Sequence, residues 1–310
     1  LLLTTEAIVV EKKEKKKAED KKSLDTDRAA WQKKHDADMA RWTPDMHAQA
    51  KVLSEKTFPN GKAALTAAIA GKHRSAGNPE RDVYRHPLET LEFFGFRPNM
   101  AVLDVGPGEG WYTEILAPAL AKQGKYFATN GDPNGPPDAR PTFYAQRWKG
   151  FLETSPELYG KIETLTVDGK APKLAKDNTF DMVMVMRGVH GMINGKTWHT
   201  WLDEAHRSLK PNGVLCIEEH RAKSDANPEE SAKQGYVPEK YVIESAEKHG
   251  FKLAAKSEIN ANAKDTKDYP DGVWDLPPTL RQGDKDKDKY TAIGESDRMT
   301  LKFVKVTPKK

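Results

Sequence analysis

The sequence predicts an α/β fold in which helices cover both faces of a doubly wound, mostly parallel sheet of seven strands. From residue 101 onward, short apolar segments of strand length alternate with longer segments of helical periodicity, a pattern typical of parallel sheets. The first apolar segment ends in the turn Gly106-Pro107-Gly108-Glu109-Gly110, which is typical of the first loop of a nucleotide-binding sheet. We place this domain at residues 61–310, and we expect residues 1–60 to form a charged extension that is helical or partly disordered.

The strands of this domain are predicted from short apolar runs bounded by turn residues. We expect strands at residues 101–105, 125–129, 162–167, 180–186, 214–218, 251–259 and 299–306. The turn Lys210-Pro211-Asn212-Gly213 leads into the fifth of them. Residues 260–297, between the sixth and seventh strands, form an unusually long loop, and such loops are often functional. This loop is expected to be either a lid over a site or a rigid cover for the sheet edge.

The helices are predicted from apolar residues that recur at helical spacing. We expect helices at residues 63–70, 88–94, 111–122, 142–153, 197–209 and 238–249. Gly250 follows the last of these helices at the position where a left-handed residue commonly ends a helix. Because helices separate most of the strands, neighbouring strands are expected to run parallel.

Composition limits the classes of protein to which the chain can belong. The 310 residues carry a net charge of +4 from 50 basic and 46 acidic residues that are mixed along the chain. Because no ladder of basic and aromatic residues accompanies this small charge, we do not expect a nucleic-acid partner. The single cysteine, Cys216, excludes an intrachain disulfide framework and a metal site built from cysteines. No apolar stretch is long enough to predict a membrane span.

The extension at residues 1–60 mixes charged and apolar segments. Residues 11–22 are almost wholly Lys, Glu and Asp, which is typical of a solvated helix face or a disordered tether. Trp31, Met39 and Trp42 could dock a helix onto the main domain. The apolar residues 1–10 fit either the remnant of a signal peptide or the first turns of a helix. Self-association through residues 1–60 is a further hypothesis.

Candidate cofactor residues follow the first three strands, because ligands of open α/β sheets bind beyond the carboxyl ends of the strands. Asp132 comes 22 residues after Gly110, at an offset suited to binding both ribose hydroxyls, and Asp168 can accept a hydrogen bond from an adenine amino group. Either acid could instead serve only to form a turn. The predicted cofactor-binding residues are Asp104, Gly106, Gly108, Glu109, Gly110, Asp132, Asp168 and Gly169. The shorter glycine spacing disfavours a nicotinamide dinucleotide.

The glycine-rich segment also carries a family resemblance. Other segments carry the same resemblance: His73-Arg74-Ser75-Ala76, Tyr84-Arg85-His86-Pro87, Arg187-Gly188-Val189-His190, Glu219-His220-Arg221 and the C-terminal segments at residues 263–270 and 294–299. Together these motifs resemble a bacterial family of predicted class I methyltransferases, many of which carry export signals, over roughly residues 61–306. The resemblance implies a Rossmann-like sheet with an antiparallel seventh strand and S-adenosylmethionine (SAM) as the cofactor. It also favours an exported or periplasmic location over a cytoplasmic one.

Candidate catalytic residues follow the fourth and fifth strands, where an acceptor would meet the methyl end of the cofactor. Arg187, His190 and His220 occupy these positions, and the alternative for each histidine is a packed residue that caps its strand. The acceptor is expected to be a small or medium-sized molecule. Four further residues could contact it: Tyr84, His86, Arg221 and Trp274.

A metal site is not predicted from the sequence. His190, Glu219, His220 and Asp132 could converge, but no closely spaced pair of histidines supports a site. The acidic run that begins at Asp284 has Lys289 where a calcium loop needs glycine, so we interpret it as a solvated charge run. Two alternative functions stay open: the same sheet used for SAM-independent, metal- or histidine-assisted chemistry, and a non-catalytic binding or structural protein.

Overall fold

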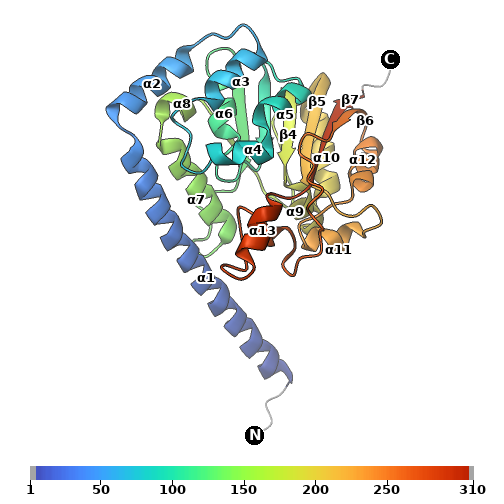
Figure 1. Cartoon of the computed structure of the whole chain (residues 1–310). Helices are drawn as coiled ribbons and strands as arrows, with labels where there is room; N and C mark the ends of the chain where they lie inside the picture. Colours follow the sequence, from blue (N-terminus) through green and yellow to red (C-terminus); the bar gives the residue numbers. More distant parts are fainter. Residues whose placement is uncertain (1–4, 307–310) are drawn as a thin grey trace.

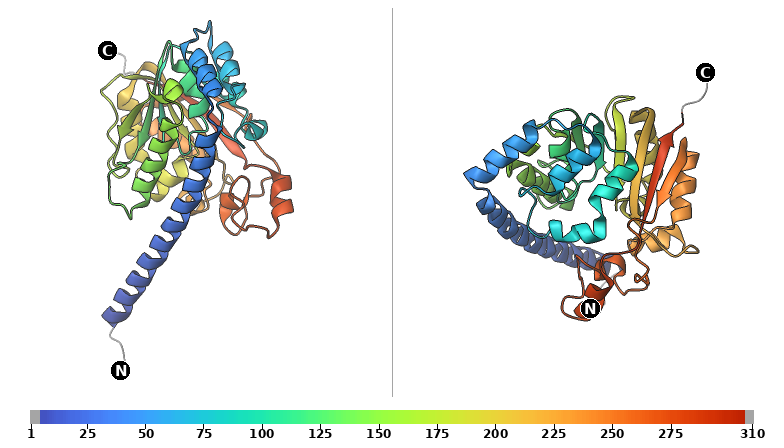
Figure 2. Two further views of the ribbon diagram at one scale, coloured as in Figure 1. Left: turned by 90° about the vertical axis from the view of Figure 1, so that its left-hand side faces the viewer. Right: turned by 45° about the horizontal axis from the view of Figure 1, so that its top comes forward.

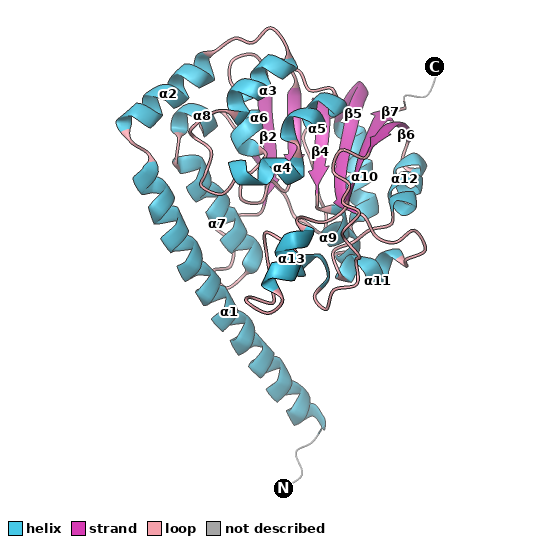
Figure 3. Ribbon diagram, in the orientation of Figure 1, coloured by secondary structure: helices cyan, strands magenta, loops and turns pink. Residues whose placement is uncertain are grey.

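The computed structural model describes the backbone of residues 5–306 and the side chains of residues 20–306. Its centre is a seven-stranded sheet in the order β3-β2-β1-β4-β5-β7-β6, with helices on both faces (Figures 1 and 3). The strands are β1 (Ala101–Val105), β2 (Lys125–Asn130), β3 (Glu163–Thr166), β4 (Phe180–Met186), β5 (Leu209–His220), β6 (Phe251–Ser257) and β7 (Arg298–Lys305). Strands β1 to β5 run parallel, and β7 pairs antiparallel with both β5 and β6. The predicted fold class is confirmed.

The helices vary widely in length. The longer ones are α1 (Thr5–Arg41), α2 (Pro44–Glu55), α3 (Gly61–Ile69), α5 (Pro87–Phe94), α6 (Thr113–Leu120), α7 (Arg140–Glu153), α10 (Trp198–Ser208) and α12 (Glu239–Lys248). The short ones are η1 (Pro79–Arg81), α4 (Asp82–Arg85), α8 (Pro156–Tyr159), α9 (Val189–Asn194), α11 (Pro228–Lys233), η2 (Gly272–Asp275) and α13 (Lys287–Ile293). In the described residues, no helix has the length and apolar character needed to cross a membrane.

The core consists of two apolar layers, one on each face of the sheet. Alternate residues of a strand point to opposite faces, so Val102 of β1 packs with α3, α5 and α6, whereas Leu103 packs with α10 and α12. Strand β1 pairs with β2 on one side and with β4 on the other. The strand order therefore reverses at β1 and β4, where open α/β sheets bind their ligands.

The N-terminal extension is a pair of helices. Helix α1 lies along α7, and its N-terminal part extends away from the domain (Figures 1 and 2). The Trp31 ring packs edge-on against Phe143 at 6.2 Å between centroids, and Trp42 is buried. Met39 stays exposed at the surface, so it does not contribute to docking as predicted. Thr43 caps the N-terminus of α2, because its side-chain oxygen accepts a hydrogen bond from the Met46 N–H at 3.3 Å.

The long loop between β6 and β7 is an ordered cover at the sheet's carboxyl edge (Figure 1). It contains η2 and α13, neither of which was predicted. Within the loop, Asn262 Nδ2 donates a hydrogen bond to the Ile293 carbonyl at 2.8 Å, and the Asp297 N–H donates to Asp265 Oδ2 at 2.8 Å. Pro278 and Thr279 of the same loop reach the cavity described below. The loop thus covers the sheet edge and also reaches the cavity, and its role as a lid stays a prediction.

Candidate active site

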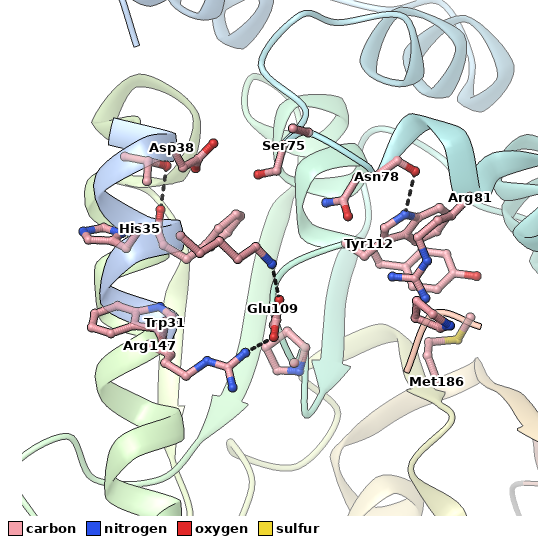
Figure 4. A pocket seen from close by; sticks show the side chains of 18 of the residues that line it. Trp31, His35, Asp38, Ser75, Asn78, Arg81, Glu109, Tyr112, Arg147 and Met186 are labelled. Atoms are coloured by element: carbon pink, nitrogen blue, oxygen red, sulfur yellow. Dashed lines mark hydrogen bonds and ion pairs between the residues drawn. The ribbon is translucent and has the colours of Figure 1, made fainter. Parts of the chain in front are cut away.

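A cavity of about 750 Å³ lies at the carboxyl ends of β1 and β4. Figure 4 shows three parts of its wall: α1 on one side, the glycine-rich loop in the middle, and a group of arginine and aromatic side chains opposite. Helix α1 contributes Trp31, Lys34, His35, Ala37, Asp38 and Arg41. The loop and the ends of β1 contribute Asp104, Gly106, Pro107, Gly108 and Glu109. The opposite wall contributes Arg81, Arg85, Tyr112, Met186 and Arg187.

The first two glycines of the loop leave room for a ligand. Gly106 and Gly108 have φ angles of 69° and 61°, in the left-handed region that favours glycine. A Cβ atom added to either would meet no protein atom within 4 Å, so the space that a side chain would fill is open to the cavity. The Gly106 N–H donates to Thr129 Oγ1 at 3.0 Å, which fixes the loop on the end of β2.

The third glycine has a different role. A Cβ atom on Gly110 would lie 2.6 Å from the ring of Phe151 in α7. The predicted glycine motif therefore divides into two positions that face the cavity and one that allows α7 to pack closely. Gly110 was predicted to bind the cofactor, and in the structure its missing side chain serves helix packing.

Asp104 is a buried carboxyl group at the cavity floor. Burial raises its pKa to about 6, although a hydrogen bond from Tyr126 and the charge of Arg187 act in the opposite direction. The Tyr126 hydroxyl donates to Asp104 Oδ2 at 2.7 Å. A proton on Asp104 can therefore be exchanged near neutral pH, which is unusual for an aspartate.

Glu109 joins the glycine-rich loop to two helices. Lys34 of α1 donates to its Oε2 at 2.6 Å, and Arg147 of α7 forms an ion pair with its Oε1 (Figure 4). Burial acts to raise the pKa of Glu109, but the charges of Arg147 and Lys34 outweigh it and hold the pKa below the ordinary value. Glu109 was predicted to bind cofactor, and here its carboxylate holds the N-terminal helix over the loop.

The wall opposite α1 carries an excess of positive charge. Four arginines share two carboxylates. Glu295 binds Arg81 Nε at 2.8 Å and Arg298 Nη1 at 2.6 Å, with Arg85 Nε at 3.0 Å. Glu218 accepts a hydrogen bond from the Tyr112 hydroxyl at 2.7 Å and forms an ion pair with Arg187 Nη1 at 3.2 Å.

Arg187, which among the described side chains pairs with Glu218 alone, was predicted to be catalytic. Its φ angle of 57° places it in the left-handed region directly after β4. The nearby Glu218 raises its pKa in spite of burial, so the guanidinium remains charged. Because Arg187 lines the cavity, it is placed to attract an anionic group there.

His190, Glu219 and His220 form a compact cluster next to Arg187. The backbone N–H of His190 donates to Glu219 Oε2 at 3.2 Å, and that of His220 donates to Oε1 at 2.9 Å. His190 Nδ1 lies 3.1 Å from Oε1, and His220 Nδ1 lies 2.6 Å from Ser296 Oγ. Burial lowers the pKa of His190, but Glu219 outweighs it and the pKa lies above its ordinary value. Burial, with the charges of His190, Arg298 and Arg187, lowers the pKa of His220 well below its ordinary value.

Besides Gly110, three predicted cofactor residues lie outside the cavity lining: Asp132, Asp168 and Gly169. Strand β2 continues to Asn130, so Asp132 lies two residues beyond it, and its carboxylate accepts the Asn134 N–H at 2.8 Å. The Asp168 carboxylate accepts the Lys170 N–H at 2.9 Å, and Gly169 is exposed. Both acids therefore close turns in this structure. Their contacts with a ribose or an adenine stay predictions.

Arg221 has a structural role in place of the predicted contact with substrate. Its guanidinium binds Asp297 Oδ1 at 2.9 Å, Glu239 Oε2 at 3.0 Å and Glu258 Oε2 at 2.6 Å. These ion pairs connect the end of β5 to α12, β6 and the long loop. Because these carboxylates occupy its guanidinium, the side chain has little capacity left to bind a substrate.

The other predicted substrate residues are spread around the cluster. The Trp274 ring packs edge-on against His190 at 5.9 Å between centroids. Tyr84 is exposed, and its backbone carbonyl accepts a hydrogen bond from Arg298. His86 has a φ angle of 41°, and its Nδ1 lies 3.3 Å from Asn260 Oδ1. Of the predicted substrate residues, only Trp274 therefore contacts a predicted catalytic residue.

Sequence reasoning missed the part that α1 plays in the cavity. Its charged and aromatic lining residues at positions 31, 34, 35, 38 and 41 recur at intervals of three or four, which places them on one face of the helix. That spacing indicates that one face of α1 packs against the protein, but it does not identify the partner, because α7 lies far along the chain. Arg28 Nη1, for example, donates to Gln146 Oε1 across 118 residues.

Comparisons with known proteins agree with this architecture. A family model described as a methyltransferase domain matches residues 80–261. No curated protein matches the sequence. A protein from Galdieria sulphuraria, provisionally assigned as a sarcosine dimethylglycine methyltransferase, is similar over 77% of this chain and 90% of its own, with 14% identity and a TM-score of 0.50. A SAM-dependent methyltransferase from Aquifex aeolicus is similar over 74% of this chain and 94% of its own, with 20% identity and a TM-score of 0.48.

Proposed function

Because the chain belongs to the class I SAM-dependent methyltransferases, we propose that it transfers a methyl group from SAM to a small or medium-sized acceptor bound at the cavity. When bound, this cofactor supplies an electrophilic methyl group on a sulfonium sulfur. The cavity volume of about 750 Å³ falls within the range of about 300–1,000 Å³ that is typical of small-molecule sites. Helix α1 forms one wall, which favours a compact acceptor over a macromolecule.

The observation that carries this proposal is the open space in front of Gly106 and Gly108. Both glycines adopt a backbone that other residues rarely adopt, and neither is needed for packing against the protein. Because this space also lies in the cavity, it supports the proposal that a ligand approaches the backbone closely here. Asp104 lies at the base of the same space and can accept a hydrogen bond from a ligand amino group when it is ionised.

The acceptor is proposed to bind on the side of the cavity formed by the end of β4. Arg187 lines the cavity there and would orient an anionic group of the acceptor. His190 and His220 lie outside the cavity lining but next to Arg187, so we propose that they contact the part of the acceptor that extends past Arg187. Displacement at a methyl group needs alignment and the exclusion of water more than acid–base help, and the walls formed by α1 and the long loop provide that exclusion.

The test is calorimetric titration of SAM and its demethylated product, S-adenosylhomocysteine, into the full chain. Gly108→Ala should lower the affinity by roughly tenfold or more, about 1.4 kcal/mol, because its Cβ would occupy the ligand space. Gly283→Ala is a matched control: Gly283 has a φ angle of 64° and equally open surroundings but lies outside the cavity lining. Failure of the folded wild-type chain to bind either compound would overturn the proposal, as would equal binding by both variants.

A further inference from the structure

We propose that His190, Glu219 and His220 form a binding site for a divalent transition-metal ion such as Zn²⁺. Each residue offers one ligand atom, and these atoms all lie within 4.8 Å of one another. Two imidazole nitrogens and one carboxylate oxygen are a donor set that suits Zn²⁺ and related ions. Mg²⁺ and Ca²⁺ prefer ligand sets made of oxygen atoms, so they fit this cluster less well.

The sheet register brings the three residues together. Strands β4 and β5 pair in parallel with Met186 opposite Glu218, so the residues that follow each strand emerge side by side. His190 then lies in the first turn of α9, beside the two residues that end β5. A separation of 29 residues between His190 and Glu219 conceals this site from motif searches, which led to the expectation of no metal.

The candidate ligands are held in place by neighbouring groups. Two backbone N–H groups fix the Glu219 carboxylate, and Ser296 Oγ lies 2.6 Å from His220 Nδ1. Among the side chains of residues 20–306, no hydrogen bond engages the Nε2 atom of His190 or of His220. Metal ligands are commonly oriented by such partners on their other polar atoms, so the cluster has the supporting contacts of a built site.

The positive charges nearest the cluster oppose a cation, but they are paired with a carboxylate of their own. The nearest guanidinium groups, those of Arg187 and Arg298, are directed to Glu218 at 3.2 Å and 2.8 Å. Trp274, which belongs to the long loop, packs against His190 and covers that side of the cluster. Three protein ligands leave coordination positions open to a small molecule. If the proposed function holds, the acceptor carries an oxygen or sulfur donor that binds the ion next to Arg187.

The test is titration of Zn²⁺ into the chelator-treated full chain, with the heat of binding and the melting temperature as readouts. The wild-type chain should bind one ion per chain and melt at a higher temperature when Zn²⁺ is present. His190→Gln and His220→Gln should each lower the affinity by about a hundredfold, and Ser296→Ala by roughly tenfold. Melting curves without metal show whether each variant folds.

A second histidine pair provides the matched control. His199 Nδ1 and His249 Nε2 lie 3.0 Å apart at the surface, where they could bind Zn²⁺ adventitiously. His249→Gln should leave the site intact. Loss of binding in His249→Gln together with retention in His190→Gln would identify an adventitious ion only and overturn the inference. Zn²⁺ binding does not depend on SAM binding, so the metal titration and the SAM titration fail separately.

Discussion

At the scale of single residues, Asp104 predicts how stability depends on pH. Its folded pKa of about 6 exceeds the ordinary 3.8, so the folded chain binds this proton more tightly than the unfolded chain does. The stability from that proton is fully present below pH 3.8 and is lost as the pH rises through 6. Asp104→Asn should therefore raise the free energy of unfolding at pH 8 by up to about 3 kcal/mol.

Denaturant unfolding between pH 4 and pH 8 checks this prediction. The advantage of the Asn variant should shrink as the pH falls, because both side chains are then neutral. An advantage that stays constant over this range would contradict the role of the Asp104 proton. If Asp104 also contacts the cofactor, the more stable variant should bind S-adenosylhomocysteine less tightly, in line with the common conflict between stability and function.

Gly110 tests the division within the glycine motif. Gly110→Ala places a Cβ against Phe151 and forces alanine into a left-handed backbone, so it should destabilise the fold by about 2–4 kcal/mol. Replacing Phe151 by leucine in the same chain should recover the packing part of that loss and leave the backbone part. Urea unfolding of the single and double variants measures both. No recovery in the double variant would exclude the ring contact as the cause.

Arg221 tests whether an arginine near the site is structural. Arg221→Ala removes the ion pairs with Asp297, Glu239 and Glu258 and should lower the free energy of unfolding by about 1–3 kcal/mol. Its affinity for S-adenosylhomocysteine should match that of the wild-type chain. A change in that affinity without a change in stability would contradict a purely structural role for Arg221.

At the scale of elements, α1 is the helix whose docking the site depends on. Trp31→Ala removes the contacts with Phe143 and Gly150 on α7, so the amides of α1 should exchange with solvent faster while those of the sheet do not change. Lys33→Ala, at an exposed neighbouring position, is the control. Hydrogen exchange followed by mass spectrometry gives the comparison, and equal exchange in both variants would contradict the proposed docking contact.

The sequence predicted some helices and strands more accurately than others. The strand at 180–186 was predicted to the residue because the apolar run at residues 182–186, preceded by Phe180 and bounded by polar flanks, defines a buried strand. Helices α8, α9 and α11 were missed, since segments of four to six residues are too short to show helical periodicity. The end of β2 was placed one residue early, so Asp132 lies two residues beyond the strand end and not three.

At the scale of the whole molecule, local patterns predicted the sheet but only part of the site. The glycine-rich turn, Asp104 and Arg187 lie next to strand ends, so the rule for open α/β sheets placed them at the cavity. The contribution of α1 depends on contacts between distant segments, which one sequence does not display, whereas His190, Glu219 and His220 were expected to be able to converge but not to bind a metal. Self-association through residues 1–60 stays a prediction, and light scattering during size-exclusion chromatography of the full chain checks it.

The ion pairs of Glu295 have a consequence for synthesis. Its partners Arg81 and Arg85 precede it by 214 and 210 residues, and the ribosome adds about 5–20 residues per second. The arginines therefore emerge roughly 10–40 seconds before their carboxylate exists. The nascent chain cannot complete this wall of the cavity until Glu295 has been added, so the finished pocket forms late in the synthesis of the domain. A ligand of the cavity can then assist only the folding step in which residues 81–85 meet Glu295, and not the earlier ones.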